Sequence, residues 1–233
     1  MLVFIVAEIG VNWNGDFELV KEMMLKSKKN GFDAVKFQSF NKEIVENHPN
    51  REVLLKSSIS EKNVKEIHEI ATNIGIEWFS TPMYPEAVDF LEPFVKKYKI
   101  REFDGRKLLE NTSTELTDKV FQTKKEVFVS SESSPKESIY YNHQNLKWLY
   151  CVPKYPCGLT DLNFKNIKEF YGYSNHCNEI IVPITSAALG CKFIEIHITS
   201  NKQKEFIDNP VSFDYDQSFE IIKQIRKIEK IAR

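Results

Sequence analysis

Two histidines end short apolar segments late in this 233-residue chain. His176 closes the stretch "FYGYSNH" and His197 closes "FIEIH". One histidine at a strand end is more often structural than a ligand, but two at the ends of adjacent strands can converge. Two imidazoles leave the other coordination positions of a metal ion to water or to substrate oxygens. The pattern therefore suggests a two-histidine metal site, with a purely structural pair as the alternative.

Lysines inside apolar segments are the second chemical signal. Lys36 lies in "AVKFQ" and Lys99 lies in "KYKI". Burying an ammonium group is unfavourable unless a carboxylate or an anionic ligand meets it. Hydroxyl groups occur at the ends of three further segments, at Ser80, Thr81, Ser130, Ser131 and Ser174. Together these groups predict a pocket for a phosphate or a carboxylate. A structural ion pair between Lys36 and Glu8 is the alternative for the first lysine.

Eight short apolar segments must position these groups. They are predicted as strands at 3–9, 33–38, 76–80, 97–100, 126–131, 146–151, 170–174 and 193–197, and amphipathic helical patterns separate most of them. The segments are apolar on both faces, which favours a parallel sheet covered by helices. Asp16 and Ser60 suit helix N-caps, and Gly31, Gly75 and Gly190 suit helix ends.

Eight β/α units in a chain of this length predict an α/β fold of the (β/α)8 TIM-barrel type, with residues 1–233 as a single domain. An open doubly wound sheet is the competing fold. The weakest predicted helix follows the fifth strand, in "PKESIYYNHQ". In a barrel, the reactive groups come from the C-terminal ends of the strands and the loops after them.

The composition is that of an ordinary globular protein. A formal net charge of −1 argues against nucleic acid or a membrane surface as the main partner. The apolar start lacks the basic region and the cleavage site of a signal peptide, and no segment is long enough to cross a bilayer. Four cysteines without a C-x-x-C spacing indicate core residues in a reducing compartment. A cytoplasmic location is therefore expected.

Several motifs in this barrel order resemble the N-acetylneuraminate (sialic acid) synthase family. They are "AEIGVNWNGD", "DAVKFQSF", "FSTPMYPEAVDFL", "KYKI", "YP" after the sixth strand, "GYSNH" and "IEIHIT". The resemblance covers nearly the whole chain, from about Phe4 to Ile228. It implies a metal-dependent condensation of phosphoenolpyruvate with an N-acyl amino sugar, N-acetylmannosamine or a related one. The implied products are a sialic acid or another nonulosonic acid and phosphate.

The resemblance also implies roles for individual residues. The implied metal ligands are His176 and His197, with Mn²⁺ expected and Mg²⁺ or Co²⁺ as other choices. The implied catalytic residues are Glu8, Lys36 and Asp104. The implied substrate-binding residues are Thr81, Lys99, Ser130, Ser131, Tyr155, Ser174, Asn175 and Asp208. Glu110 is the other residue that can align with the family's strand-four glutamate.

This sequence departs from the family pattern at several of these places. Trp13 replaces a histidine of the opening motif, and Glu102 replaces a phosphate-binding serine after the fourth strand. Glu102 would place a negative charge near a trianionic ligand unless Arg101 or Arg106 offsets it. Pro153 replaces an asparagine. The C-terminal antifreeze-like domain of typical members is expected to be missing, so the partner is expected to be a second copy of the chain or a separate cap-domain protein.

Two other functions remain open at this level. The first is a lyase or aldolase on the same barrel, with Lys36 or Lys99 as a Schiff-base amine. The second is a ligand-binding or assembly subunit of a polysaccharide pathway that has lost turnover. Glu102 and Pro153 support the second alternative.

Overall fold

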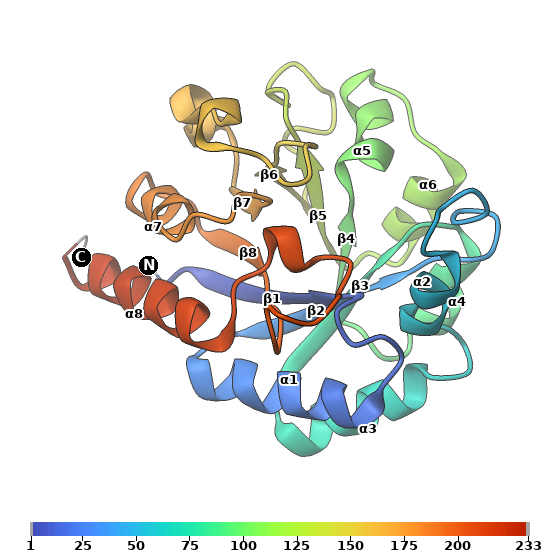
Figure 1. Ribbon diagram of the computed structural model, residues 1–233. Helices are drawn as coiled ribbons and strands as arrows, with labels where there is room; N and C mark the ends of the chain where they lie inside the picture. The colour runs from blue at the N-terminus through green and yellow to red at the C-terminus, as the bar shows by residue number, and fades with distance from the viewer. Residues whose placement is uncertain (1, 232–233) are drawn as a thin grey trace.

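Eight parallel strands close into a barrel, as the alternating pattern predicts (Figure 1). The strands are β1 (Phe4–Gly10), β2 (Ala34–Ser39), β3 (Glu77–Pro82), β4 (Lys97–Ile100), β5 (Glu126–Ser131), β6 (Leu146–Tyr150), β7 (Gly172–Asn175) and β8 (Phe193–His197). The computed structural model describes residues 2–231. β8 pairs with β1 and places His197 opposite Glu8, which closes the ring. The predicted TIM barrel is confirmed, and the open sheet is excluded.

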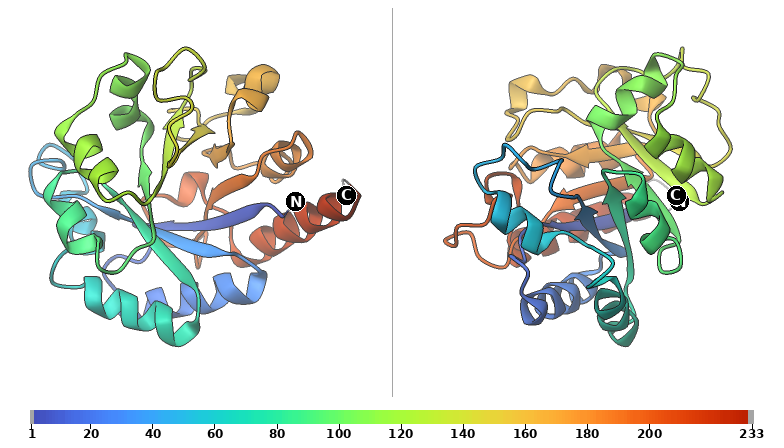
Figure 2. Two further views of the ribbon diagram at one scale, coloured as in Figure 1. Left: turned by 180° about the vertical axis from the view of Figure 1, so that it is seen from behind. Right: turned by 90° about the vertical axis from the view of Figure 1, so that its right-hand side faces the viewer.

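Helices surround the barrel on its outer face (Figures 1 and 2). They are α1 (Phe17–Asn30), α2 (Arg51–Ser57), α3 (Val64–Ile74), α4 (Glu86–Leu91), α5 (Glu102–Leu109), α6 (Glu115–Gln122), α7 (Ile181–Ala188) and α8 (Tyr215–Ile231). Three short 3₁₀ helices complete the described chain, namely η1 (Leu159–Asp161), η2 (Phe164–Glu169) and η3 (Asn209–Val211). In the described residues, no helix has both the length and the apolar character that a membrane crossing requires.

The helix ends follow the predicted signals with one exception. The Asp16 side chain accepts hydrogen bonds from the first turn of α1, and Gly31 ends that helix in the left-handed conformation, with φ 95°. The prediction that Ser60 caps a helix is wrong, because α3 begins only at Val64. The Asn63 side chain bonds back to the Ser60 amide at 2.8 Å and so holds residues 60–63 in a turn.

The helical cover is thin behind β5 and β6. Residues 132–145, all of them described, form turns, so the weak helix predicted there is wrong. Besides the hydrogen bonds of its own turns, this segment bonds to the region of α5: the Ser138 hydroxyl donates to the Leu108 carbonyl at 2.6 Å, and the Ile139 amide donates to Asn111 at 2.9 Å. Between β6 and β7 the chain forms the 3₁₀ helix η2, which Asn166 interrupts with non-helical dihedral angles.

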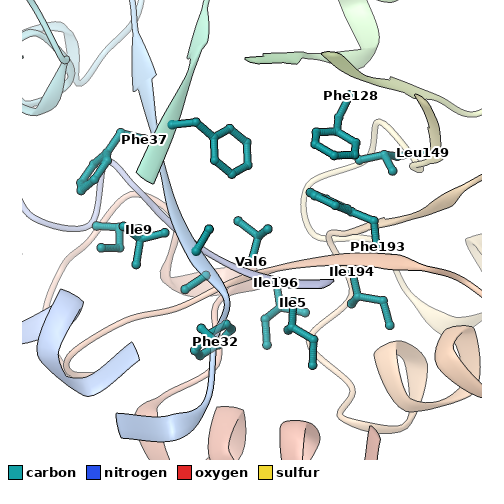
Figure 3. Packing of buried hydrophobic residues seen from close by; sticks show 14 of the residues in the cluster. Ile5, Val6, Ile9, Phe32, Phe37, Phe128, Leu149, Phe193, Ile194 and Ile196 are labelled. Carbon is teal, nitrogen blue, oxygen red and sulfur yellow. The ribbon is translucent and has the colours of Figure 1, made fainter. Parts of the chain in front are cut away.

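Aliphatic and aromatic side chains pack together along the strands of the barrel (Figure 3). The rings of Phe128 and Phe193 stack with centroids 4.1 Å apart. Gly172 permits the close approach of β7 to β8, because a Cβ there would lie 2.2 Å from the Phe193 carbonyl oxygen. This packing leaves the C-terminal ends of the strands as the place for polar chemistry.

Trp13 anchors the segment after β1 to α2. Its ring is fully buried and makes edge contacts with Phe17 and Phe37. Its indole Nε1 donates to the Ser57 carbonyl at 2.9 Å. The tryptophan that stands at the family's histidine position is therefore structural here, and it holds α2 beside the mouth of the barrel.

Candidate active site

A cavity of about 550 Å³ opens at the C-terminal ends of the strands. Ten of the residues singled out from the sequence line it: Glu8, Lys36, Thr81, Lys99, Ser130, Tyr155, Ser174, His176, His197 and Asp208. They come from all eight strands or the loops after them, and one of them, Asp208, comes from the segment between β8 and α8, which crosses in front of the strand ends in Figure 1. The barrel thus brings together side chains up to 200 residues apart in sequence.

Lys36 lies at the bottom of the cavity, and only 3% of it is exposed. Its Nζ lies 3.0 Å from Glu8 Oε2 and 3.6 Å from Glu195 Oε1, and it donates to the Thr81 hydroxyl at 2.9 Å. The predicted ion pair with Glu8 therefore exists, and a second carboxylate supplements it.

Lys99 shares that second carboxylate. Its Nζ lies 3.4 Å from Glu195 Oε1 and 3.4 Å from the Ser174 hydroxyl, which itself donates to Glu195 at 2.9 Å. We call the seven residues Glu8, Lys36, Thr81, Lys99, Ser130, Ser174 and Glu195 the floor of the cavity. The buried Ser130 hydroxyl and Glu195 Oε2 have no hydrogen-bond partner among the described residues, so both remain available to a ligand.

Glu195 is a site residue that was not predicted from the sequence. A signal was present, because it is the one charged residue in the strand "FIEIH" and it stands two positions before His197. Alternate residues of a strand face the same side, so a glutamate at this position points into the barrel with the histidine. Cys151 was also missed, and its buried thiol lies 3.7 Å from a ring nitrogen of His176.

The buried charged groups shift one another's pKa values. Burial alone would raise the pKa of Glu195, but Lys36 and Lys99 outweigh it and lower that pKa to about 2. Burial alone would lower the pKa of Lys36, but Glu195 and Glu8 together raise it. Burial raises the pKa of Glu8, although Lys36 opposes the shift. Two carboxyl groups on one floor therefore titrate apart, which is typical of acid–base sites.

The two histidines face each other across the cavity with ring centroids 5.6 Å apart. His176 Nδ1 lies 2.9 Å from the Val152 carbonyl oxygen, a contact that leaves Nε2 free when Nδ1 carries the proton. His197 Nδ1 lies 3.2 Å from the Tyr155 hydroxyl and 3.5 Å from Asp208 Oδ2. Imidazoles that bind a metal through one ring nitrogen usually hydrogen-bond through the other to a backbone carbonyl or a carboxylate, as these two histidines can.

The donor set fits a metal ion with open coordination positions. Among residues 2–231, no group of three or more His, Cys, Asp or Glu side chains is arranged to hold a metal by itself. His176 and His197 supply two ring nitrogens, and Asp208 Oδ2 is a buried oxygen 3.5 Å from His197 Nδ1. Two imidazoles with oxygen donors suit a divalent first-row metal whose other positions are filled by water or substrate.

Tyr155 and Asp208 lie beside this pair. Tyr155 is 45% exposed, but its hydroxyl points inward against His197. Burial of that hydroxyl, together with the Asp208 charge, raises the pKa of Tyr155 well above its usual value. The pKa of Asp208 is lowered, because contacts with His197 outweigh the effect of burial. Asp208 is therefore an ionised acceptor near neutral pH.

Three residues expected in the site lie elsewhere. Asp104 stands on α5 outside the cavity wall, where it holds Arg101 at 2.5 Å, so its expected catalytic role is not supported by its position. The Ser131 hydroxyl donates to the Ser133 carbonyl at 2.7 Å. The Asn175 amide donates to the Cys177 carbonyl at 2.8 Å. The last two fold the loops after β5 and β7.

The start of α5 forms one side of the cavity mouth. Glu102 and Arg106 pair at 2.8 Å, and the exposed ring of Phe103 lies between the guanidinium groups of Arg101 and Arg106, at 5.2 and 5.7 Å. We call Arg101, Glu102, Phe103 and Arg106 the charged rim. Arg106 offsets Glu102, as the sequence analysis required of one of the two arginines.

Another part of the wall is largely apolar, although His48 also lines the cavity. It consists of Val11 after β1, Leu54 on α2, Met83 after β3 and Ile207 in the segment before α8. These residues belong to a small hydrophobic cluster that is separate from the main core. We call them the apolar rim.

The fold and the cavity define a TIM-barrel enzyme with paired buried charges at the ends of its strands. The model of the NeuB family matches residues 23–233, and this chain belongs to that family. It is accordingly a synthase-like enzyme.

Named relatives cover almost the whole chain. The N,N'-diacetyllegionaminic acid synthase of Legionella pneumophila is 30% identical over 99% of this chain and 73% of its own length. The pseudaminic acid synthase of Campylobacter jejuni is 28% identical over 97% of this chain and 74% of its own length. An uncharacterized protein of Methanocaldococcus jannaschii is 34% identical over 98% of this chain and 71% of its own length.

A solved structure agrees with the fold. The N-acetylneuraminic acid (sialic acid) synthetase of Leptospira borgpetersenii, in complex with citrate, superimposes with a TM-score of 0.85 and 24% identity. The superposition includes 100% of this chain and 85% of the chain of the synthetase. At this level of identity the similarity supports the barrel fold alone.

Proposed function

We propose that this protein condenses phosphoenolpyruvate with an N-acyl amino sugar to form a nonulosonic acid and phosphate. The observation that carries the proposal is the floor, where two lysines with 3% exposure converge with free or shared hydroxyls beside two facing histidines. A small ligand with both a carboxylate and a phosphate matches two separate buried cations. The relatives that are named as nonulosonic acid synthases support the same reaction.

Phosphoenolpyruvate would bind on the floor. Lys36 and Lys99 supply the positive charge, and the hydroxyls of Thr81, Ser130 and Ser174 supply short neutral donors. Ser130 has no partner in the described chain, so its hydroxyl is free to bind the ligand. Glu195 holds the two ammonium groups at fixed positions before the anion arrives. Such preorganised charges are effective because the site excludes water.

The reaction balances without an external reductant or oxidant. Carbon three of phosphoenolpyruvate attacks the aldehyde carbon of the open-chain sugar, and the oxygen of water adds at carbon two. The C–O bond to the phosphate then breaks. One proton of that water ends on the new hydroxyl group and the other on the phosphate.

Glu8 would act as the proton donor and Asp208 as a hydrogen-bond acceptor. Burial raises the pKa of Glu8, so of the two floor carboxylates Glu8 takes up a proton more readily and can pass it to the aldehyde oxygen. Asp208 stays ionised and accepts hydrogen bonds from hydroxyls of the sugar. Gly10 brings both groups together, because a Cβ on it would lie 2.7 Å from Asp208 Oδ2 and 3.3 Å from Glu8 Oε1. Its φ of 54° also favours glycine.

His176 and His197 would hold a divalent metal, for which Mn²⁺ is the first choice and Mg²⁺ or Co²⁺ are alternatives. When bound, such an ion supplies Lewis-acid polarisation of the aldehyde oxygen. Tyr155 and the Val152 carbonyl orient the two rings from behind. A homodimer, or a separate cap-domain protein, stays a prediction.

The Schiff-base alternative is disfavoured at Lys36. An amine nucleophile must lose its proton, whereas Glu195 and Glu8 raise the pKa of Lys36 against the effect of burial. Borohydride treatment in the presence of a carbonyl substrate is therefore expected to leave no covalent adduct at Lys36.

The direct test is phosphate release from phosphoenolpyruvate by the purified protein with Mn²⁺. N-acetylmannosamine and related N-acyl amino sugars serve as acceptors. His176→Ala should abolish the release, while His143→Ala, at the opposite end of the barrel, should retain it. Release that needs both the metal and an acceptor supports the proposal. Folded protein that releases no phosphate with any acceptor would overturn it in favour of a binding role.

A further inference from the structure

A second cavity, of about 500 Å³, lies at the N-terminal ends of the strands, at the opposite end of the barrel from the candidate active site. Its wall is formed by the start of β6, the residues that lead into β7 and β8, the turns at 141–144, η2 and the residues after α7. The helical cover is thin at this place, because residues 132–145 form turns and η2 is a short 3₁₀ helix. A cavity of this size is large enough for a small molecule.

Three lysines supply most of the charge on this wall. They are Lys147 on β6, Lys168 on η2 and Lys192 just before β8, and Glu169 is the one carboxylate that lines the second cavity. Among the described residues, no carboxylate oxygen lies within 4.0 Å of the three ammonium groups. Glu169 itself accepts a hydrogen bond from the Ser134 hydroxyl. The lysines and the glutamate therefore leave an excess of two positive charges on the wall.

Two of these lysines differ from another lysine at the same end of the barrel. Lys97 begins β4, and its Nζ pairs with Glu77 at 2.5 Å. The ammonium groups of Lys147 and Lys192 instead lie against the ring of Tyr171, at 5.3 and 5.8 Å from its centroid. A ring attracts an ammonium group but leaves its charge uncompensated. Both groups thus lie beside one ring with their capacity to bind an anion unused.

An apolar surface adjoins the three lysines. The side chains of Leu146, Trp148, Ile167 and Phe170 line the second cavity, and each of these residues is at most 8% exposed. A simple anion would use the lysines alone. A ligand that carries an apolar group beside its anionic group would use both parts of the wall, because burying the apolar group against these side chains adds to the affinity.

We propose that the second cavity binds a phosphate monoester with an apolar group, whose phosphate is held by Lys147 and Lys192. A phosphate monoester carries nearly two negative charges at neutral pH, which matches the excess charge on the wall, whereas one carboxylate would compensate only half of it. Lysine binds phosphate as a point charge on a flexible stem, so both ammonium groups can turn towards one anion. A ligand at this end of the barrel is separate from the substrates at the floor, and the inference does not depend on the function proposed above.

The test is isothermal titration calorimetry of the full chain with phenyl phosphate, a probe that joins one phosphate to one apolar ring. Lys147→Met combined with Lys192→Met removes both charges and keeps most of the apolar stems. We expect this double variant to bind the probe about 10- to 100-fold more weakly than the wild type, because two charge-assisted contacts are lost. Lys65→Met combined with Lys165→Met is the matched control. It removes two exposed lysines that do not line the second cavity, so its affinity should equal that of the wild type.

A further variant separates the second cavity from the floor. Phenyl phosphate should bind to Lys99→Met as it does to the wild type. A loss of binding in Lys99→Met with wild-type affinity in the double variant of Lys147 and Lys192 would place the probe on the floor and overturn the proposal. Equal weakening in the two double variants would overturn it as well, since the attraction would then be a property of the overall charge. The same holds if the wild type does not bind the probe.

Inorganic phosphate tests the apolar part of the wall. It should bind about tenfold more weakly than phenyl phosphate, because it leaves the apolar side chains without a ligand group. Equal affinities of the two probes would contradict a site for a phosphate monoester with an apolar group.

Discussion

The floor of the cavity and the start of α5 each contain two cations and two carboxylates. On the floor these are Lys36, Lys99, Glu8 and Glu195, which come from four different strands and are at most 3% exposed. On α5 they are two pairs along one helix, Arg101 with Asp104 and Arg106 with Glu102, and the Arg106 side chain is 52% exposed.

The same charges do different things in the two places. Solvent screens the pairs on α5, so each contributes little beyond local order. On the floor the charges cannot be screened by water, and removing one leaves its partners buried and unpaired. Burial by itself would raise the pKa of Glu195, but the unscreened charges of Lys36 and Lys99 lower that pKa to about 2.

The largest expected effect is a loss of kcat/KM in one of two lysine substitutions on the same strand, β4. Lys99→Met removes a floor cation and should lower kcat/KM for phosphoenolpyruvate by about 10²- to 10³-fold. Lys97→Met is the matched control, because Lys97 lies two residues earlier and pairs with Glu77 at 2.5 Å away from the cavity. Steady-state phosphate release measures both variants. Similar losses in the two would contradict the assignment of Lys99 to the site.

Removal of the shared carboxylate should mainly change stability. Glu195→Gln leaves Lys36 and Lys99 with one carboxylate between them, and the free energy of unfolding should fall by about 3–5 kcal/mol. Denaturant titration measures this difference. Added phosphate should raise the melting temperature more in the variant than in the wild type, because an anion can replace the lost charge.

The pH dependence of that difference follows from the low pKa of Glu195. A carboxyl group whose pKa is depressed in the folded state stabilises the fold above its ordinary pKa of 4.5 and loses that contribution as the pH falls towards 2. The difference in the free energy of unfolding between wild type and Glu195→Gln should therefore be largest above about pH 4.5 and become smaller below it. A gap that widens on acidification would show that Glu195 is not held ionised.

The smallest effect is expected at the charged rim. Arg106→Ala leaves the Glu102 charge uncompensated at the mouth, and KM for phosphoenolpyruvate should rise about two- to threefold. Glu102→Gln combined with Arg106→Ala should return KM to the wild-type value, because both charges are then gone. Initial-rate kinetics on the three variants check this. A loss as large as that of Lys99→Met would mean that Arg106 belongs to the floor chemistry.

Local patterns predicted most of the barrel. The segments "KYKI", "EVFVSS" and "FIEIH" became β4, β5 and β8 with the predicted bounds, because apolar β-forming runs between helical patterns have few other uses. The segment after β5 was mispredicted, since its polar groups bond to the region of α5 and such long-range bonds leave no local signal.

The site was predicted in part for a similar reason. Strand-end positions identified Lys36, Lys99, His176 and His197, because a closed parallel barrel gathers the strand ends at one mouth. Asp104 was misplaced, since the helix after β4 begins at Glu102 and turns this side chain towards Arg101.

By itself, the sequence of this protein determined the closed barrel, the family and the residue types available at the strand ends. The tertiary structure decided which of those residues meet. It joined Lys36 and Lys99 through Glu195, excluded Asp104 from the cavity wall and gave the cavity both an apolar rim and a charged rim. The physical reason is that periodicity is a local property of the chain. Charge pairing and burial depend instead on distances between residues that are far apart in sequence.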